Sequence, residues 1–219
     1  MENISTSLRK LHMSGMAMCW KTMTETHKAD KLTFRYGLEF LIQSEMDTRH
    51  HNKIARLIKN AGFRQGASLE ELETSESRGI SAGIISQLST GEYINQGATV
   101  VISGPTGTGK SFLATALGES ACRLGYRVKY YTLTRLIDEV RLARLEGKEL
   151  KFFEKMEHLD LLIIDDRYHK KSLILSSQLA VSDWYSIFSN EMLAEACLDR
   201  IVHKAIRFTL KGDSMRKKY

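Results

Sequence analysis

The sequence has little proline and little cysteine. Its only proline is Pro105, so long helices can run without interruption. Its three cysteines, Cys19, Cys122 and Cys197, are far apart and match no zinc-ligand spacing, which excludes a disulfide scaffold and predicts reduced thiols. No apolar run approaches the ~18 residues of a membrane-spanning helix. We therefore expect a cytoplasmic protein with no membrane partner.

What the chain does contain is typical of a soluble globular protein. Its 219 residues are 42% hydrophobic and 26% charged, with a net charge of +6. The positive charge is uneven: Arg49–Leu69 has five Lys/Arg and no acid, and Arg200–Tyr219 has seven Lys/Arg against one acid. Two basic stretches fit a polyanionic partner such as nucleic acid, and two solvated basic faces fit the same pattern.

The hydrophobic pattern divides the chain into three regions. Residues 1–64 form an N-terminal helical region, because apolar residues in Gly37–Phe63 recur at spacings of three and four. Residues 65–97 are a polar linker followed by a short helix. Residues 98–219 alternate strands and helices: we expect strands at 98–103, 127–131, 159–165 and 173–177, and helices at 112–124, 133–145 and 183–197. This alternation predicts an α/β fold with a parallel sheet flanked by helices.

One motif is specific for phosphate binding. Gly104-Pro105-Thr106-Gly107-Thr108-Gly109-Lys110-Ser111 fits the P-loop pattern GxxxxGK[ST], with a strand before it and a helix after it. The glycines let the loop turn its backbone N–H groups inward around phosphate oxygens, and the helix N-terminus adds positive potential. Lys110 is expected to reach the β- and γ-phosphates, and the Ser111 hydroxyl to bind Mg²⁺. The motif predicts an ATP and Mg²⁺ site in a P-loop NTPase domain over 98–219.

A second motif supplies carboxylates. Leu159-Asp-Leu-Leu-Ile-Ile-Asp165-Asp166 is a very apolar strand that ends in two acids. In a parallel sheet such a strand delivers its carboxylates beside the phosphate loop. We expect one of them, Asp165 in the simplest assignment, to hold the Mg²⁺ shell and the other to orient or deprotonate water.

Several segments together resemble the IstB-like group of AAA+ ATPases, which are helper proteins of insertion-sequence transposition related to the DnaC helicase loader. They are LRKLHMSGMA, GPTGTGKSFLATALG, CRLGYRVKYYT, HLDLLIIDD, SSQL, LDRIVHKA and LKGDSMRKK. The resemblance implies ATP-dependent homo-oligomers that bind duplex DNA without sequence preference and present it to a transposase subunit. It also implies an ATPase activity, for which Asp165 and Asp166 would be catalytic.

The resemblance also carries three further residues over to this chain. Arg200 takes the place of an arginine finger that completes a neighbouring subunit's ATP site; an ordinary helix arginine paired with Asp199 or Glu195 is the alternative. Ser177 and Gln178 fall where the family has its polar phosphate-sensing residue; capping of a strand end is the alternative. The basic stretch Arg49–Arg64 lies in the region that such helpers use for DNA and transposase contacts.

One interval departs from the family pattern. Only six residues separate Asp166 from Leu173, whereas a crossover between neighbouring parallel strands needs about a dozen residues and usually contains a helix. We hypothesise that the chain has lost roughly twenty residues by a join between two similar acidic stretches. An antiparallel return would move Ser177 about 16 Å from the sensor position. A parallel return would need a nearly extended connection and leave apolar surface uncovered. Either way we expect ATP binding with poor hydrolysis and reduced stability.

Three alternatives to a transposition helper remain at this point. A DnaC-type replicative helicase loader shares the fold. A non-catalytic interaction protein that binds ATP is consistent with the short connection after Asp166. A P-loop kinase of small molecules is a third, but no arginine-bearing lid or acceptor pocket can be identified for it.

Overall fold

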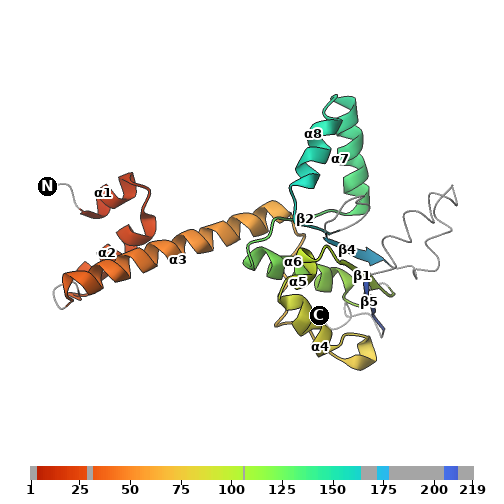
Figure 1. Ribbon diagram of the computed structural model, residues 1–219, viewed down its shortest axis with the longest axis horizontal. Helices are drawn as coiled ribbons and strands as arrows, with labels where there is room; N and C mark the ends of the chain where they lie inside the picture. The colour runs from red at the N-terminus through yellow and green to blue at the C-terminus, as the bar shows by residue number, and fades with distance from the viewer. Residues whose placement is uncertain (1–3, 29–31, 106, 164–171, 178–204, 212–219) are drawn as a thin grey trace. The chain divides into compact units, whose positions relative to one another are not determined.

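The computed structural model describes residues 4–28, 32–105, 107–163, 172–177 and 205–211, and these divide into two compact units. Unit 1 is Met1–Arg56 and unit 2 is Leu57–Tyr219. Unit 1 contains α1 (Ile4–Lys10), α2 (Ser14–Glu25) and most of α3 (Phe34–Ala61), which ends in unit 2 (Figure 1). The helix expected over Gly37–Phe63 is confirmed as α3.

Unit 1 is held together by a buried carboxylate. Glu45 of α3 is 7% exposed and accepts hydrogen bonds from the backbone N–H groups of Gly15 (2.8 Å) and Met16 (3.1 Å), the first turn of α2. Arg49 donates to the same carboxylate over 2.7 Å. A Cβ on Gly15 would lie 2.5 Å from the Ser44 carbonyl oxygen, so glycine is what lets α2 approach α3 this closely. A side chain of α3 therefore caps α2.

We expect Glu45→Ala to destabilise unit 1 by about 2 kcal/mol, because the buried Gly15 amide and the partly buried Met16 amide lose their acceptor. The hydrogen bond from Arg49 and those from the two amides hold the Glu45 pKa below its usual value, although burial opposes them. This contribution to stability is present above the unfolded pKa near 4.5 and is lost as the pH falls through the lower, folded value.

Hydrogen exchange of the Gly15 and Met16 amides measures this effect. At constant pH exchange should accelerate in Glu45→Ala. In the wild type the protection factors of the two amides, taken relative to the intrinsic exchange rate at each pH, should fall on acidification below the ordinary carboxyl pKa. Glu39→Ala removes an exposed i,i+4 partner of Arg35 and should leave both amides unchanged. Equal acceleration in the two variants would contradict the capping role of Glu45.

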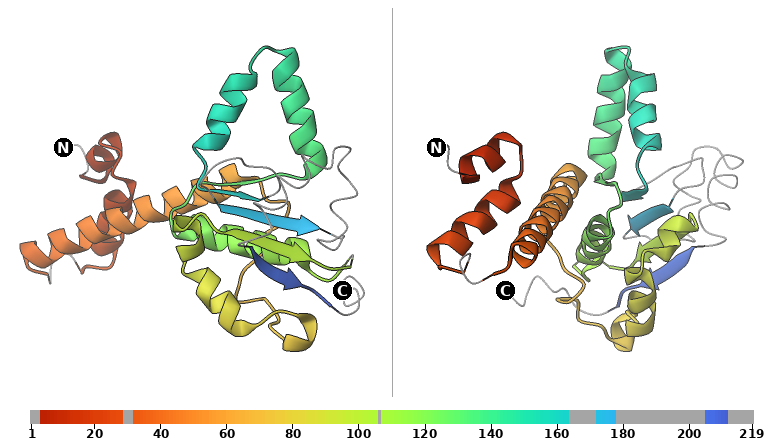
Figure 2. Two further views of the ribbon diagram at one scale, coloured as in Figure 1. Left: turned by 45° about the vertical axis from the view of Figure 1, so that its right-hand side comes forward. Right: turned by 60° about the vertical axis from the view of Figure 1, so that its left-hand side comes forward.

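Unit 2 is built on a five-stranded parallel sheet of order β2-β3-β4-β1-β5 (Figure 2). The strands are β1 (Thr99–Ser103), β2 (Val128–Tyr130), β3 (Leu161–Ile163), β4 (Ser172–Ser177) and β5 (Ile206–Thr209). The register places Ser103 opposite Ser177 and Ile163 opposite Ile174. The carboxyl ends of β1 and β4 therefore lie side by side. The α/β fold with a parallel sheet is confirmed, and β4 runs parallel to β3.

Helix α6 (Lys110–Arg123) packs against the sheet and carries the phosphate loop at its N-terminus. Ten of its residues are buried, so it is an interior helix rather than an amphipathic one. A Cβ on Gly118 would lie 2.6 Å from the Ile163 Cδ1 atom, and this close approach sets the distance between α6 and β3. Gly125, at φ 95°, follows the helix C-terminus, where a left-handed residue ends a helix.

The polar stretch after α3 packs on the same core. Leu69 and Leu72 pack against the hydrophobic cluster of unit 2, and Ile80, which follows η2 (Glu76–Arg78), belongs to it. Helices α4 (Ala82–Ser89) and α5 (Glu92–Asn95) also contribute buried residues to this cluster. Ala67 donates its N–H to Glu119 of α6 over 3.0 Å. The segment before β1 is thereby fixed to the helix that begins at the phosphate loop.

Within residues 98–219, α8 (Glu149–Glu157) and β5 were not anticipated from the sequence. Helix α7 (Leu133–Leu145) has the predicted bounds, and Figures 1 and 2 show α7 and α8 side by side as a hairpin that projects from the sheet. Leu145 and Leu150, on either side of its turn, are 86% and 80% exposed. The helix expected over 183–197 lies outside the described residues. Of the helices that the structure describes, none has the length and hydropathy to cross a bilayer.

Candidate nucleotide-binding site

The phosphate loop follows β1 and has the backbone that its glycines predict. Gly104, Gly107 and Gly109 have φ values of 142°, 86° and 90°, in the region that disfavours other residues. Gly109 is the N-cap of α6, and its carbonyl accepts a hydrogen bond from Leu113 N (2.9 Å). The loop is thus a left-handed turn that leads directly into a helix N-terminus, which is the arrangement that binds phosphate. Thr106 lies outside the described residues.

The end of strand β5 and the residue after it pack against the start of this loop. A Cβ on Gly104 would collide with the Leu210 carbonyl oxygen, and Leu210 N donates to Ser103 O over 2.8 Å. Ser103 also donates its hydroxyl to Phe208 O (3.2 Å). The turn at Gly104 is therefore packed against the residues that follow β5, and only glycine fits there.

Two side chains of the loop meet at one carbonyl. Lys110 Nζ donates to Pro105 O over 2.6 Å, and Thr108 Oγ1 donates to the same oxygen over 2.9 Å. Both residues are buried, at 7% and 1% exposure, whereas Ser111 is exposed at the first turn of α6. Burial lowers the pKa of the Lys110 ammonium, and neighbouring phosphate charge would oppose that change. The loop holds a cation against its own backbone.

The predicted carboxylates and sensors are described only in part. Ser177 ends β4 opposite Ser103, so its backbone lies beside the residue that precedes the loop. Asp165 and Asp166 follow β3, but they lie outside the described residues, as do Gln178 and Arg200. The structure thus brings the backbone of Ser177 close to the loop, and the roles of all five residues are proposals.

Arg78 contacts the loop and was not singled out from the sequence. Its Nη2 atom lies 3.3 Å from the Thr108 carbonyl oxygen, and its Nη1 atom lies 3.2 Å from a carboxylate oxygen of Glu73. A lone arginine in a polar linker carries no motif, although its neighbour Gly79, at φ 75°, marks a position where the chain must turn.

A polar cavity of about 600 Å³ lies elsewhere in unit 2. It is at the end of β2, and Arg64 and Arg135 contribute to its lining. It shares no residue with the phosphate loop, so we do not assign it to the nucleotide. Among the described residues, no cluster of three or more His, Cys, Asp or Glu could hold a metal ion.

The sequence profile of the family described as "IstB-like ATP binding protein" matches residues 6–167 and 163–219. The chain belongs to this family. Its fold class and phosphate loop are those that the sequence predicted, and the resemblance to IstB-like AAA+ proteins is confirmed. The IstB-like profile matches in two segments that both contain residues 163–167.

Relatives cover nearly the whole IstB-like chain. The protein y4pL of Sinorhizobium fredii, named for an insertion sequence and for ATP binding, is 32% identical over 96% of this chain and 94% of its own length. The insertion sequence IS21 ATP-binding protein of Pseudomonas aeruginosa is 27% identical over 100% of this chain and 90% of its own.

Solved structures agree on the fold. Aquifex aeolicus DnaA bound to AMPPCP has a TM-score of 0.55 at 20% identity, over 71% of this chain and 53% of that one. DnaI has a TM-score of 0.53 at 13% identity, over 73% of this chain and 92% of that one. The IstB-like chain spans about half the length of the DnaA chain. At these identities the likeness shows an AAA+-type P-loop fold and nothing finer.

Proposed function

We propose that the phosphate loop of this IstB-like chain binds ATP with Mg²⁺. The observation that carries the proposal is the left-handed turn over Gly107–Gly109 leading into α6, with the buried Lys110 beside it. Lys110 and the backbone N–H groups would neutralise the phosphates, and the Ser111 hydroxyl and Asp165 would hold Mg²⁺. Calorimetry with Mg²⁺ and ATP on the folded chain tests this directly, because no heat of binding would refute it.

We further propose that ATP turnover in this chain is weak, because a segment between β3 and β4 has been lost. Two comparisons support a loss. The family profile matches twice across residues 163–167, as expected when two similar stretches have been joined. The alignment with the IS21 protein runs over 238 positions, more than the 219 residues of this chain, so part of that relative has no counterpart here.

The register adds a physical argument for the same loss. Ile163 pairs with Ile174, and Leu161 pairs with Ser172, so residues 164–171 must return the chain from the end of β3 to the start of a parallel neighbour. Such crossovers usually contain a helix that covers the sheet. The two proposed carboxylates, Asp165 and Asp166, fall within this shortened interval. Nucleotide binding depends on β1, β5 and α6, which are intact, whereas positioning of the attacking water depends on the interval.

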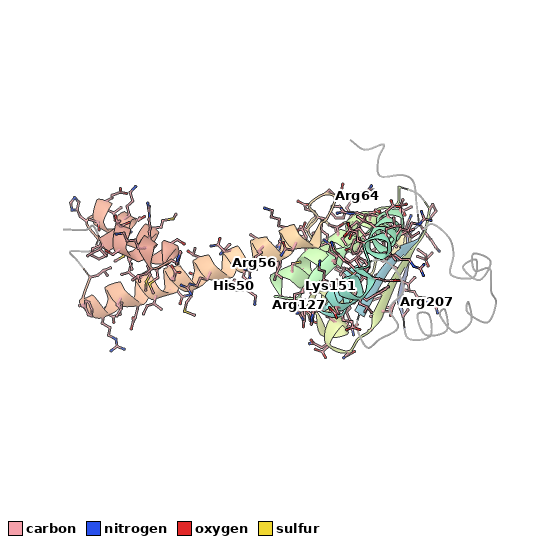
Figure 3. The ribbon with its side chains drawn as sticks, turned by 90° about the horizontal axis from the view of Figure 1, so that it is seen from above. His50, Arg56, Arg64, Arg127, Lys151 and Arg207 are labelled. Atoms are coloured by element: carbon pink, nitrogen blue, oxygen red, sulfur yellow. The ribbon has the colours of Figure 1, made fainter. Side chains whose placement is uncertain are left out.

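We propose that the chain also binds duplex DNA through the basic stretch Arg49–Arg64. On α3, Arg49, Lys53 and Arg56 follow at i, i+4 and i+7 and so share one face, and all are exposed. Figure 3 shows His50 and Arg56 along this helix. Glu45 pairs with Arg49, but no acid lies between Arg49 and Leu69 to neutralise the rest. A face of this kind favours backbone phosphates over base-specific contacts.

Lys53→Ala combined with Arg56→Ala tests the DNA-binding proposal. We expect weaker duplex binding at low salt, and a plot of log affinity against log salt that is less steep by about 0.9 for each phosphate that the variant no longer neutralises. Lys21→Ala with Arg35→Ala is the matched control, since it removes the same charge from residues paired with Glu25 and Glu39. Equal reductions of affinity in the two double variants would assign the effect to net charge alone.

The biological role that we propose is that of a transposition helper. The named functions of y4pL and of the IS21 relative support it, and the helper would present DNA to a transposase subunit as an ATP-dependent homo-oligomer. Arg200 would then act in the ATP site of the neighbouring subunit, and Ser177 and Gln178 would sense the phosphate. The alternatives are a DnaC-type replicative helicase loader and a non-catalytic ATP-binding partner protein.

A further inference from the structure

We infer that Arg78 is a positioning residue of the nucleotide site: it fixes the peptide between Thr108 and Gly109 so that the Gly109 N–H is directed at bound phosphate. The inference rests on the proposed nucleotide binding and adds a residue outside the P-loop motif. Arg78 ends η2, before the sheet begins, and lies 26 or more positions from every residue of the loop.

The contact is made to the backbone of the loop and not to a side chain. Arg78 Nη2 donates to Thr108 O over 3.3 Å, and it would lie 3.5 Å from a Cβ placed on Gly109. The guanidinium is therefore against one face of the 108–109 peptide. Its side chain is 19% exposed, so water competes little for this hydrogen bond.

Because the peptide is planar, this contact to Thr108 O also fixes the direction of the Gly109 N–H. In a trans peptide the C=O of one residue and the N–H of the next point in opposite directions, and the described chain has no cis peptide bonds. With Thr108 O held towards Arg78, the Gly109 N–H must point away from it. None of the described residues accepts a hydrogen bond from this N–H. It is one of the open donors at the N-terminus of α6, where phosphate is expected.

Arg78 is itself held from two sides. Its carbonyl accepts a hydrogen bond from Lys211 N (3.1 Å), and its N–H donates to Ser75 O (3.1 Å). The next residue, Gly79, packs so closely on Thr209 of β5 that a Cβ would collide with the carbonyl there. The guanidinium thus extends from a backbone fixed to β5, the strand whose end also supports Gly104. The residues that follow β5 therefore hold the start of the loop at Gly104, and Arg78, anchored on the same strand, holds its end at Thr108.

The charge of the guanidinium suits this role better than a neutral donor would. Glu73 is 63% exposed and takes one side of the guanidinium fork at Nη1, which leaves Nη2 for Thr108. A hydrogen bond from a charged donor is stronger than one between neutral groups, and the planar fork serves two acceptors at once. A lysine at this position offers a single point of charge and would satisfy the two acceptors less well.

The test measures Mg²⁺–ATP and Mg²⁺–ADP affinities by calorimetry for the wild type, Arg78→Met and Arg78→Lys. We expect a loss of about tenfold for Arg78→Met with both nucleotides, because the loop amides serve the phosphates that ATP and ADP share. Arg78→Lys should show an intermediate loss of about threefold. In NMR spectra, the shift of the Gly109 amide on adding nucleotide should be reduced in Arg78→Met.

Arg127→Met is the matched control. Arg127 makes comparable hydrogen bonds, to Asp160 over 3.1 and 3.0 Å, but it precedes β2 at the opposite edge of the sheet from the loop, and Figure 3 labels it. Its replacement should lower stability and leave nucleotide affinity and the Gly109 amide unchanged. If Arg78→Met does not fold, Arg78→Lys decides the matter: unchanged affinity overturns the inference and the threefold loss supports it.

The outcomes separate the inference from the proposed function. A wild-type chain that binds neither nucleotide refutes the proposed ATP site and the inference with it. Wild-type binding with unchanged affinity in Arg78→Met overturns the role of Arg78 alone. A loss that Arg127→Met reproduces would also overturn it, because the effect would then come from general destabilisation.

Discussion

Lys110→Ala is expected to weaken ATP binding at least about 100-fold, which in calorimetry would appear as no measurable heat. In the free chain Lys110 is buried and donates to Pro105 O, so it already lies within the loop that receives the phosphates. Removing it takes away the only side-chain cation of the loop motif. The backbone N–H groups alone would then face a highly charged phosphate chain.

Lys129→Ala is the control for this variant. Lys129 also donates to a backbone carbonyl, that of Asn60, over 3.0 Å, but it lies on β2 outside the loop. Its replacement should leave ATP affinity unchanged at temperatures where both variants are folded. If Lys110→Ala retained the binding heat of the wild type, the nucleotide could not be held by the phosphate loop.

The second large effect concerns turnover. We consider a variant in which the residues that y4pL carries in the corresponding interval are inserted after Asp166. We expect this variant to hydrolyse ATP on the order of 100-fold faster or more, with little change in ATP affinity. The physical reason is that the loop lies between β1 and α6 and is already held by the residues after β5, whereas the interval that we propose to be shortened contains the two proposed catalytic carboxylates. The inserted crossover would let both carboxylates follow a strand that ends beside Ser177.

Two controls accompany the insertion. A Gly/Ser segment of the same length relieves the short connection without supplying a helix, and it should not restore turnover. The insertion combined with Asp165→Asn should bind ATP and hydrolyse it slowly. Phosphate release is the measurement in each case. If the unmodified chain turned over ATP as fast as y4pL does, the proposed loss would have no catalytic consequence.

Local patterns were sufficient for most of unit 2. The five residues of β1 are a run of mostly apolar residues. Helix α7 has spaced apolar residues, and it starts after Thr132, whose hydroxyl accepts a hydrogen bond from Arg135 N. The phosphate loop was predictable because its glycines and Lys110 are constrained by the chemistry of phosphate binding. These signals lie within a few neighbouring residues, which is why sequence alone reveals them.

Contacts between distant residues were not predictable in the same way. Glu45 resembles any helix glutamate until Gly15 brings the start of α2 against it. Arg78 resembles any linker arginine until η2 meets the loop. Strand β5 has only four residues, Ile206–Thr209, and polar residues interrupt its apolar pattern. Each of these features depends on tertiary packing, for which a single sequence carries no local signal.

The pairing of β5 with β1 has a consequence for biosynthesis. Ser103 and Phe208, which are joined by a hydrogen bond, lie 105 positions apart, and Gly104 packs against Leu210. A nascent polypeptide on the ribosome therefore contains the P-loop motif long before it contains the strand that supports it. Closing so long a loop of chain is a slow, late step in folding. Affinity for ATP should accordingly arise only after translation has passed Lys211, and chains halted earlier would be subject to proteolysis without protection by the nucleotide.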